Sequence, residues 1–192
     1  IVINSGLSNP ADIFINKTRK TFEAKNDYKV KLLGSGSIFQ EAMKAAEILS
    51  KEYDIKVEIY SVTSYNELTR EAQDLERENL LNLDTTAKTP YIEKVLGSDT
   101  DSIIISATDY MKAYSEQLRP YIKGNFKALG TDGFGRSDSR ANLRKFFEVD
   151  TNFIAYTTLA ELAINGKIDK KVALEAKNKY AIDTNKINPR NA

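Results

Sequence analysis

The chain has 192 residues, enough to form one domain with a single hydrophobic core. Its 28 basic and 27 acidic residues leave a net charge of +1, which argues against a nucleic-acid or anionic-lipid partner, and no apolar run is long enough to cross a bilayer. The absence of cysteine and histidine excludes disulfides, removes the commonest general base and metal ligands, and argues against a self-sufficient acid–base enzyme.

After a leading segment, short β-branched runs alternate with longer helical patterns, which is typical of a parallel sheet covered by helices on both faces. Residues 30–33 predict a strand, and residues 37–53 predict a helix that follows a glycine turn. Ser37 and Gln40 have the spacing of a capping box, so we expect their side chains to cap the start of this helix.

A second strand is predicted over residues 57–62, followed by a polar helix over residues 66–82. A narrow apolar seam on this helix is expected to face the sheet: Leu68, Ala72 and Leu75. Arg70 and Asp74 stand one helical turn apart and predict an ion pair on the solvent side. The charged residues here are typical of a solvated helix face, and they include no carboxylate pair with a defined catalytic spacing.

Residues 102–107 contain three consecutive isoleucines and predict a central strand buried on both faces. Asp109 follows this strand and is expected to cap the next helix. That helix has an apolar stripe: Met111, Tyr114 and Leu118. Pro120 is expected to end or kink it, because proline cannot donate a helical hydrogen bond.

The last part of the chain predicts a fourth strand over residues 126–129 and a helix from about residue 139 to 147 after a glycine-rich loop. Two further helices are expected over residues 151–164 and 169–180, and residues 187–190 should be extended.

The sequence from residue 30 to 180 contains no repeat and no linker, so we expect one domain there. The predicted fold class is α/β, a three-layer α/β/α sandwich with a mostly parallel sheet over residues 29–192. Residues 1–28 are expected to be a leading segment or interdomain connector. Because the chain starts at Ile1, we expect it to be a piece of a longer protein.

A glycine turn, Gly34-Ser35-Gly36, stands between the first strand and the first helix, where backbone N–H groups can hold a phosphate. The third glycine of the dinucleotide fingerprint is missing, because Phe39 occupies its place. We therefore favour a simple tight turn over a nucleotide site at this position.

The glycine-rich loop after the fourth strand is the candidate functional or interface surface: Asp132, Gly133, Phe134, Gly135, Arg136, Ser137, Asp138 and Arg140. Loops after parallel strands lie at the functional edge of an open sheet. Arginines at 136, 140 and 144 could meet carboxylates or phosphates, or they could pair with Asp132, Asp138 and a neighbouring domain. We favour interdomain or subunit packing over a ligand site.

Four motifs occur in the order LLGSGSI at residue 32, YSVTSYNEL at residue 60, ATDYMK at residue 107 and LGTDGFGRSDSR at residue 129. With them the chain resembles the carboxy-terminal part of the homodimeric, bacterial-type pyruvate dehydrogenases, which are transketolase-like thiamine diphosphate enzymes. The resemblance covers roughly five-sixths of the chain, from about Val30 onward. It implies the fold of a transketolase C-terminal domain.

The resemblance further implies a cytoplasmic parent enzyme that decarboxylates pyruvate with thiamine diphosphate and magnesium and reductively acetylates the lipoyl group of dihydrolipoyl acetyltransferase. The family's Gly-Asp-Gly cofactor motif is not matched here, because Thr131 precedes Asp132 and Gly133. We therefore assign no catalytic, cofactor-binding or metal-binding residue to this chain. Its expected role is packing within the homodimer and between domains, and we expect it to bind no thiamine diphosphate alone.

The alternative is an independent regulatory or nucleotide-binding α/β module with the same fold, since a fold alone does not determine a function. An exposed apolar patch would favour the packing role, and a polar, self-contained surface would favour the independent module.

Overall fold

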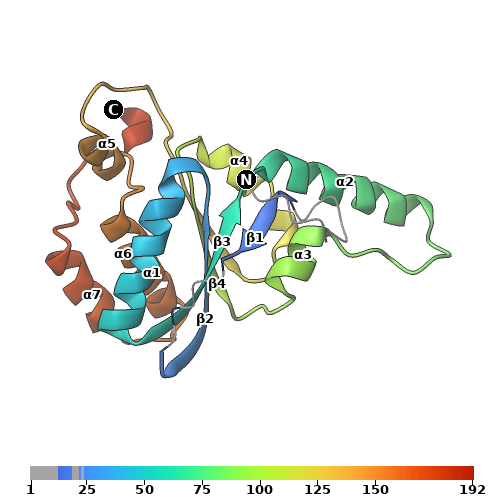
Figure 1. The fold of residues 1–192 in the computed structure, drawn as a ribbon, viewed down its shortest axis with the longest axis horizontal. Helices are drawn as coiled ribbons and strands as arrows, with labels where there is room; N and C mark the ends of the chain where they lie inside the picture. The colour runs from blue at the N-terminus through green and yellow to red at the C-terminus, as the bar shows by residue number, and fades with distance from the viewer. Residues whose placement is uncertain (1–12, 19–21, 23) are drawn as a thin grey trace.

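A computed structural model describes residues 13–18, 22 and 24–192 and contains one five-stranded sheet (Figure 1). The strand order is β1-β3-β2-β4-β5, and only β1 runs antiparallel to its neighbour. The strands have these bounds: β1 Ile15–Lys17, β2 Asn26–Gly34, β3 Ile55–Val62, β4 Ile103–Ala107 and β5 Asn125–Leu129. The mostly parallel sheet predicted from the sequence is confirmed.

Helices cover both faces of this sheet, so the predicted three-layer arrangement is also confirmed (Figure 1). One layer holds α1 Phe39–Tyr53, α6 Thr151–Ile164 and α7 Lys170–Lys179. The other holds α2 Tyr65–Leu81, α3 Tyr91–Leu96 and α4 Lys112–Glu116. Among residues 24–192, the remaining helical segments are α5 Arg140–Phe146 and the 3-10 turns η2 Gly36–Ile38, η3 Arg119–Tyr121 and η4 Pro189–Asn191.

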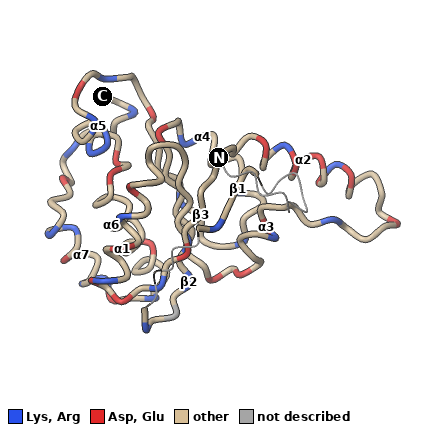
Figure 2. The backbone as a smooth tube through the Cα atoms, viewed as in Figure 1, with Lys and Arg blue, Asp and Glu red and all other residues tan. Residues whose placement is uncertain are grey.

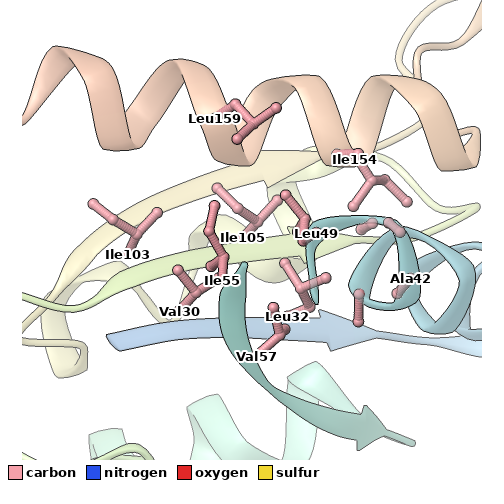
Figure 3. Close-up of a cluster of buried hydrophobic side chains, with 14 of the residues drawn as sticks. Val30, Leu32, Ala42, Leu49, Ile55, Val57, Ile103, Ile105, Ile154 and Leu159 are labelled. Atoms are coloured by element: carbon pink, nitrogen blue, oxygen red, sulfur yellow. The ribbon is translucent and has the colours of Figure 1, made fainter. Parts of the chain in front are cut away.

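The strand β4 lies between β2 and β5, and all five of its residues are buried. Its side chains alternate between two apolar clusters, because successive residues of a strand point to opposite faces. Ile103 and Ile105 pack under α1 and α6 in the cluster of Figure 3, whereas Ile104 faces the cluster under α2 and α3. The three consecutive isoleucines thus specify a strand covered by helices on both sides, as predicted.

The described part of the leading segment contributes to this sheet. β1 pairs with β3, so that Ile15 lies opposite Val62, and Phe22 forms a β-bridge with Val57. The boundary predicted between residues 28 and 29 falls inside β2, which begins at Asn26. Residues 1–12, 19–21 and 23 of the predicted connector lie outside the described residues, and the connector role stays a prediction.

The predicted capping box at the start of α1 is wrong. The chain makes the 3-10 turn η2 before α1, and no side chain caps the helix at Ile38. Ser37 instead donates a hydrogen bond from Oγ to Asp109 Oδ2 at 3.2 Å. The physical reason is that Ser37 meets a carboxylate from the loop after β4, a contact that local spacing does not encode.

The predicted solvent-side pair of Arg70 and Asp74 is also wrong, because the Arg70 guanidinium pairs with Glu67 on the preceding turn of α2. Charges three and four residues apart compete for the same partner on a helix surface.

Of the apolar seam predicted on α2, Leu68 and Ala72 are fully buried, while Leu75 is half-buried. Both signs of charge are interspersed along the helices (Figure 2), in keeping with the net charge near zero.

The predicted helix after β4 is shorter than the sequence pattern suggests. α4 ends at Glu116, and Pro120 lies in the following turn η3. Leu118 is fully buried, but Met111 is 52% exposed and does not belong to the apolar stripe. At the carboxyl end, the predicted extended segment is wrong: residues 189–191 form η4.

The remaining carboxyl-terminal predictions are confirmed. α6 spans Thr151–Ile164 as expected, and Asp150 caps it by accepting a hydrogen bond from the Phe153 N–H at 2.9 Å. α7 is capped in the same way by Asp169, which accepts from the Lys171 N–H at 2.7 Å. Both caps follow the preference of short acidic side chains for helix amino termini.

Candidate functional surface

The first end of the glycine-rich loop is fixed to the segment between β4 and α4. Thr131 donates its N–H to the Tyr110 carbonyl at 2.9 Å and its hydroxyl to the Asp109 carbonyl at 2.7 Å. Asp132 Oδ1 accepts a hydrogen bond from the Lys112 N–H, the first residue of α4, at 2.9 Å. The prediction that Asp109 caps this helix is therefore wrong, because Asp132 supplies the acceptor from another part of the chain.

The second end of the loop is fixed at the start of α5. Asp138 Oδ1 accepts hydrogen bonds from the side chain of Asn142 at 2.8 Å and from the N–H of Ser139 at 2.6 Å. Both hydrogen bonds lower the pKa of the Asp138 carboxyl, and the one from the Asn142 amide has the larger effect. Ser139 Oγ accepts from the Asn142 N–H at 3.3 Å, so the predicted helix start at Ser139 is confirmed.

In the middle of the loop, Gly133 packs against the carboxyl-terminal turn, whereas Phe134 projects into solvent. Gly133 has a φ of +104°, and a Cβ built there would lie 2.5 Å from the carbonyl oxygen of Pro189 in η4. A Cβ on Gly135 would meet nothing within 4 Å. Phe134 stands between them with 83% of its surface exposed. The loop thus holds the carboxyl-terminal turn at Gly133 and presents an aromatic ring to solvent.

The arginines near this loop have separate neighbours. The Arg136 guanidinium stacks 4.3 Å from the ring centroid of Phe146, and Arg144 Nη1 donates to Glu41 Oε1 at 2.8 Å. Arg140 and Ser137 are exposed. Within the described residues, none of these arginines pairs with Asp132 or Asp138, so the predicted pairing inside the loop is wrong. The acidic residues bind backbone and amide N–H groups instead.

Glu41 forms a buried polar centre that the sequence analysis missed. Only 7% of the residue is exposed, and its Oε2 accepts from Thr151 Oγ at 2.6 Å and from the Thr151 N–H at 3.1 Å. Burial opposes ionisation of the carboxyl, but the Thr151 hydrogen bonds and the nearby Lys44 outweigh it and lower the Glu41 pKa. Together with Arg144, this carboxylate joins α1 to the last turn of α5 and to the amino terminus of α6. A single glutamate beside apolar helix positions gives no signal of such a role.

A cleft of about 610 Å³ lies where β2, β3 and β4 end. Its walls come from the end of β3, from the loops after the three strands and from the first turns of α1, α2 and α4. The lining residues are Ser35, Gly36, Phe39, Ser61, Val62, Thr63, Ser64, Tyr65, Asn66, Tyr110 and Tyr114. At its base the Tyr65 hydroxyl and Ser106 Oγ are 2.7 Å apart, and burial raises the pKa of Tyr65. The Ser35 hydroxyl donates to Thr108 Oγ1 at 2.7 Å.

The glycine turn at this cleft does not favour a phosphate. Gly36 has a φ of +54°, and a Cβ there would lie 3.1 Å from Oδ1 of Asp109, so a carboxylate already stands against the turn. No lysine or arginine is among the lining residues. A phosphate here would face a negative charge with no cation to offset it. The turn therefore agrees with the simple tight turn that we favoured.

Among residues 13–18, 22 and 24–192, no group of three or more histidine, cysteine, aspartate or glutamate side chains could hold a metal ion. No helix in the same described ranges has the length and apolar character needed to span a membrane.

Comparison with known proteins agrees with this fold. The family model of the transketolase-like TK C-terminal domain matches residues 19–150. The chain is 50% identical over 163 residues to the pyruvate dehydrogenase E1 component of Escherichia coli K12, covering 84% of this chain and 18% of that protein. It is 43% identical over 171 residues to the pyruvate dehydrogenase E1 component of Cupriavidus necator, covering 89% of this chain and 19% of that protein.

A solved transketolase from Campylobacter jejuni has a TM-score of 0.48 and 15% identity, over 82% of this chain and 20% of that chain. The chain spans less than a fifth of the curated relatives, since the matches cover 18% and 19% of their lengths. Because the family model matches well over half of the chain, and the sheet is mostly parallel and covered on both faces, this chain belongs to the transketolase-like TK C-terminal domain family.

Proposed function

We propose that this chain is the carboxy-terminal domain of the decarboxylating component of a pyruvate dehydrogenase complex. The observation that carries the proposal is the 50% identity over 163 residues to the pyruvate dehydrogenase E1 component of Escherichia coli K12. The whole protein is then a cytoplasmic homodimer that decarboxylates pyruvate with thiamine diphosphate and magnesium. It passes the acetyl group to the lipoyl group of dihydrolipoyl acetyltransferase.

The residues of this chain do not fit the cofactor. A diphosphate needs cations or a metal held by carboxylates, and the neutral cleft at the glycine turn has the Asp109 carboxylate beside it. The carboxylate of Asp132 is used by the Lys112 N–H at the start of α4. We therefore assign no step of the decarboxylation to the described residues of this chain.

The role proposed for the chain is packing against the rest of the protein and its homodimer partner. Phe134 is 83% exposed, and Met111 is 52% exposed on the segment to which Thr131 is hydrogen-bonded. Large apolar side chains that a fixed loop holds in solvent are typical of a contact surface. This supports packing through the glycine-rich loop over a ligand site there.

The first test compares thiamine diphosphate binding, by calorimetry with magnesium, in the 192-residue chain and in the whole protein. We expect saturable binding and pyruvate turnover by the whole protein and no heat with the isolated chain. Saturable binding by the isolated chain would overturn the domain role, and a whole protein that does not turn over pyruvate would overturn the proposed enzyme.

The second test addresses packing with Phe134→Ser in the whole protein, and Leu174→Ser as the control. Leu174 is also exposed, at 54%, but it lies on α7 and not on the loop. We expect Phe134→Ser to weaken the homodimer in sedimentation or lower the whole protein's melting temperature, while leaving the isolated chain unchanged. Equal effects of the two substitutions would contradict a packing role for this loop.

A further inference from the structure

The cleft at the carboxyl edge of the sheet has the position of a ligand site. In the order β3-β2-β4, the chain passes from β2 to β3 on one side and then crosses to β4 on the other. Ligands of open α/β sheets bind outside the carboxyl ends of the strands at such a reversal of strand order. The cleft volume of about 610 Å³ lies within the range of small-molecule pockets, roughly 300–1,000 Å³.

The side chains that line this cleft directly are all uncharged. Four of them carry polar groups for which the described part of the chain provides no side-chain hydrogen-bond partner: Ser61, Asn66, Tyr110 and Tyr114. The other hydroxyls have partners, since Ser64 Oγ accepts from the Glu67 N–H at 3.2 Å and Thr63 donates to the Ile13 carbonyl at 2.6 Å. Free donors and acceptors therefore come from both the β3 and the β4 side of the cleft.

Aromatic rings stand next to these free polar groups. Phe39 lines the cleft from α1, and the rings of Tyr110 and Tyr114 meet edge to face with centroids 5.7 Å apart. Aromatic faces bind the flat apolar side of a ring, and hydroxyl and amide groups bind its polar edge. The Asp109 carboxylate against Gly36 disfavours an anionic group in this position.

We propose that this cleft binds an uncharged ring compound that carries hydroxyl groups, such as a sugar or an unphosphorylated nucleoside. The polar edge of the ligand would be bound by Asn66 and the tyrosine hydroxyls, and its apolar face would lie against the aromatic rings. The proposal does not depend on the proposed enzyme, because it uses only side chains of this chain.

The test titrates the 192-residue chain with adenosine, glucose and AMP, and follows backbone amide shifts by NMR. We expect adenosine or glucose to perturb the amides of Gly36, Val62 and Asn66 in a saturable way, and AMP to bind more weakly than adenosine. A response to adenosine alone assigns the ligand to the nucleosides, and a response to glucose assigns it to the sugars. No saturable response to either neutral probe, or tighter binding of AMP, would overturn the proposal.

The substitutions Tyr114→Phe and Asn66→Ala each remove one polar group from the cleft lining and leave the aromatic rings in place. Each should weaken binding of the neutral probe by roughly two- to tenfold, the effect of one neutral hydrogen bond. Tyr156→Phe on α6 is the matched control, because that helix lies on the other face of the sheet, and it should leave binding unchanged. Unchanged binding in Tyr114→Phe and Asn66→Ala, with both variants folded, would also overturn the proposal.

Discussion

Asp132 in the glycine-rich loop accepts the N–H of Lys112 at 2.9 Å and so caps α4, a helix that begins 20 residues earlier in the chain. This contact fixes the loop after β5 to the helix after β4. The same loop reaches Pro189 of η4 through Gly133. The candidate surface is thus built from three segments that are distant in sequence.

Removal of this cap should destabilise the chain. Asp132→Ala leaves the Lys112 N–H without its acceptor, and we expect a loss of about 0.5–2 kcal/mol in the free energy of unfolding by urea. Asp132→Asn keeps an oxygen acceptor and should lose less. If Asp132→Ala unfolds at the same urea concentration as the wild type, the cap does not contribute to stability.

Two glycines of the loop should respond differently to alanine. Gly133→Ala places a Cβ against Pro189 at a φ of +104°, so we expect a loss of roughly 1–3 kcal/mol in unfolding free energy. Gly135→Ala is the matched control, because its Cβ would meet nothing within 4 Å, and it should change stability by less than about 1 kcal/mol. Equal destabilisation by the two substitutions would contradict the packing of η4 on Gly133.

The buried carboxylate of Glu41 should make stability depend on pH. Its pKa in the folded chain lies below the ordinary value of 4.5, so the folded chain binds fewer protons than the unfolded chain near that pH. The stabilisation is therefore complete at neutral pH and is lost as the pH falls below about 4.5 through the folded pKa. Urea unfolding of the wild type and of Glu41→Gln between pH 7 and pH 3 measures how the free energy of unfolding depends on the charge of Glu41.

At pH 7, Glu41→Gln should cost roughly 1–3 kcal/mol, because the charge that faces Arg144 is lost. The difference from the wild type should shrink toward pH 3. Glu175→Gln, in an exposed pair with Lys171 at 3.9 Å, is the control and should stay within about 0.5 kcal/mol of the wild type. A difference at Glu41 that does not vary with pH would show that the carboxylate charge is not responsible.

A final prediction concerns the segment after α2, which projects with the end of that helix from the rest of the fold (Figure 1). The Asn79 side chain donates to the Lys88 carbonyl and accepts from the Lys88 N–H, both at 2.8 Å. Asn79→Ala should therefore speed amide exchange at Lys88 and proteolysis within residues 82–90. Gln73→Ala, exposed on the same helix, should change neither. Similar rates in the two variants would show that Asn79 does not hold this segment.

Local sequence patterns determined most of the elements. The three isoleucines of β4 are buried on both faces of the sheet, as predicted. The helices that begin after Ser139, Asp150 and Asp169 also start within a residue of the predicted positions. Each of these features depends on residues within a few positions of one another, so the periodicity of apolar residues is enough to predict it. The glycine-rich loop was also recognisable, because its glycines and charges are contiguous in the sequence.

Only the tertiary structure decided the partners of the polar side chains. Glu41 meets Thr151 across 110 residues, and Asp109 meets Ser37 where local spacing suggested a helix cap for each. The cleft likewise needs three strand ends side by side before its hydroxyls and aromatic rings converge. The physical reason is that helix and strand periods act over a few residues, whereas hydrogen-bond partners and cavities depend on which segments the folded sheet brings together.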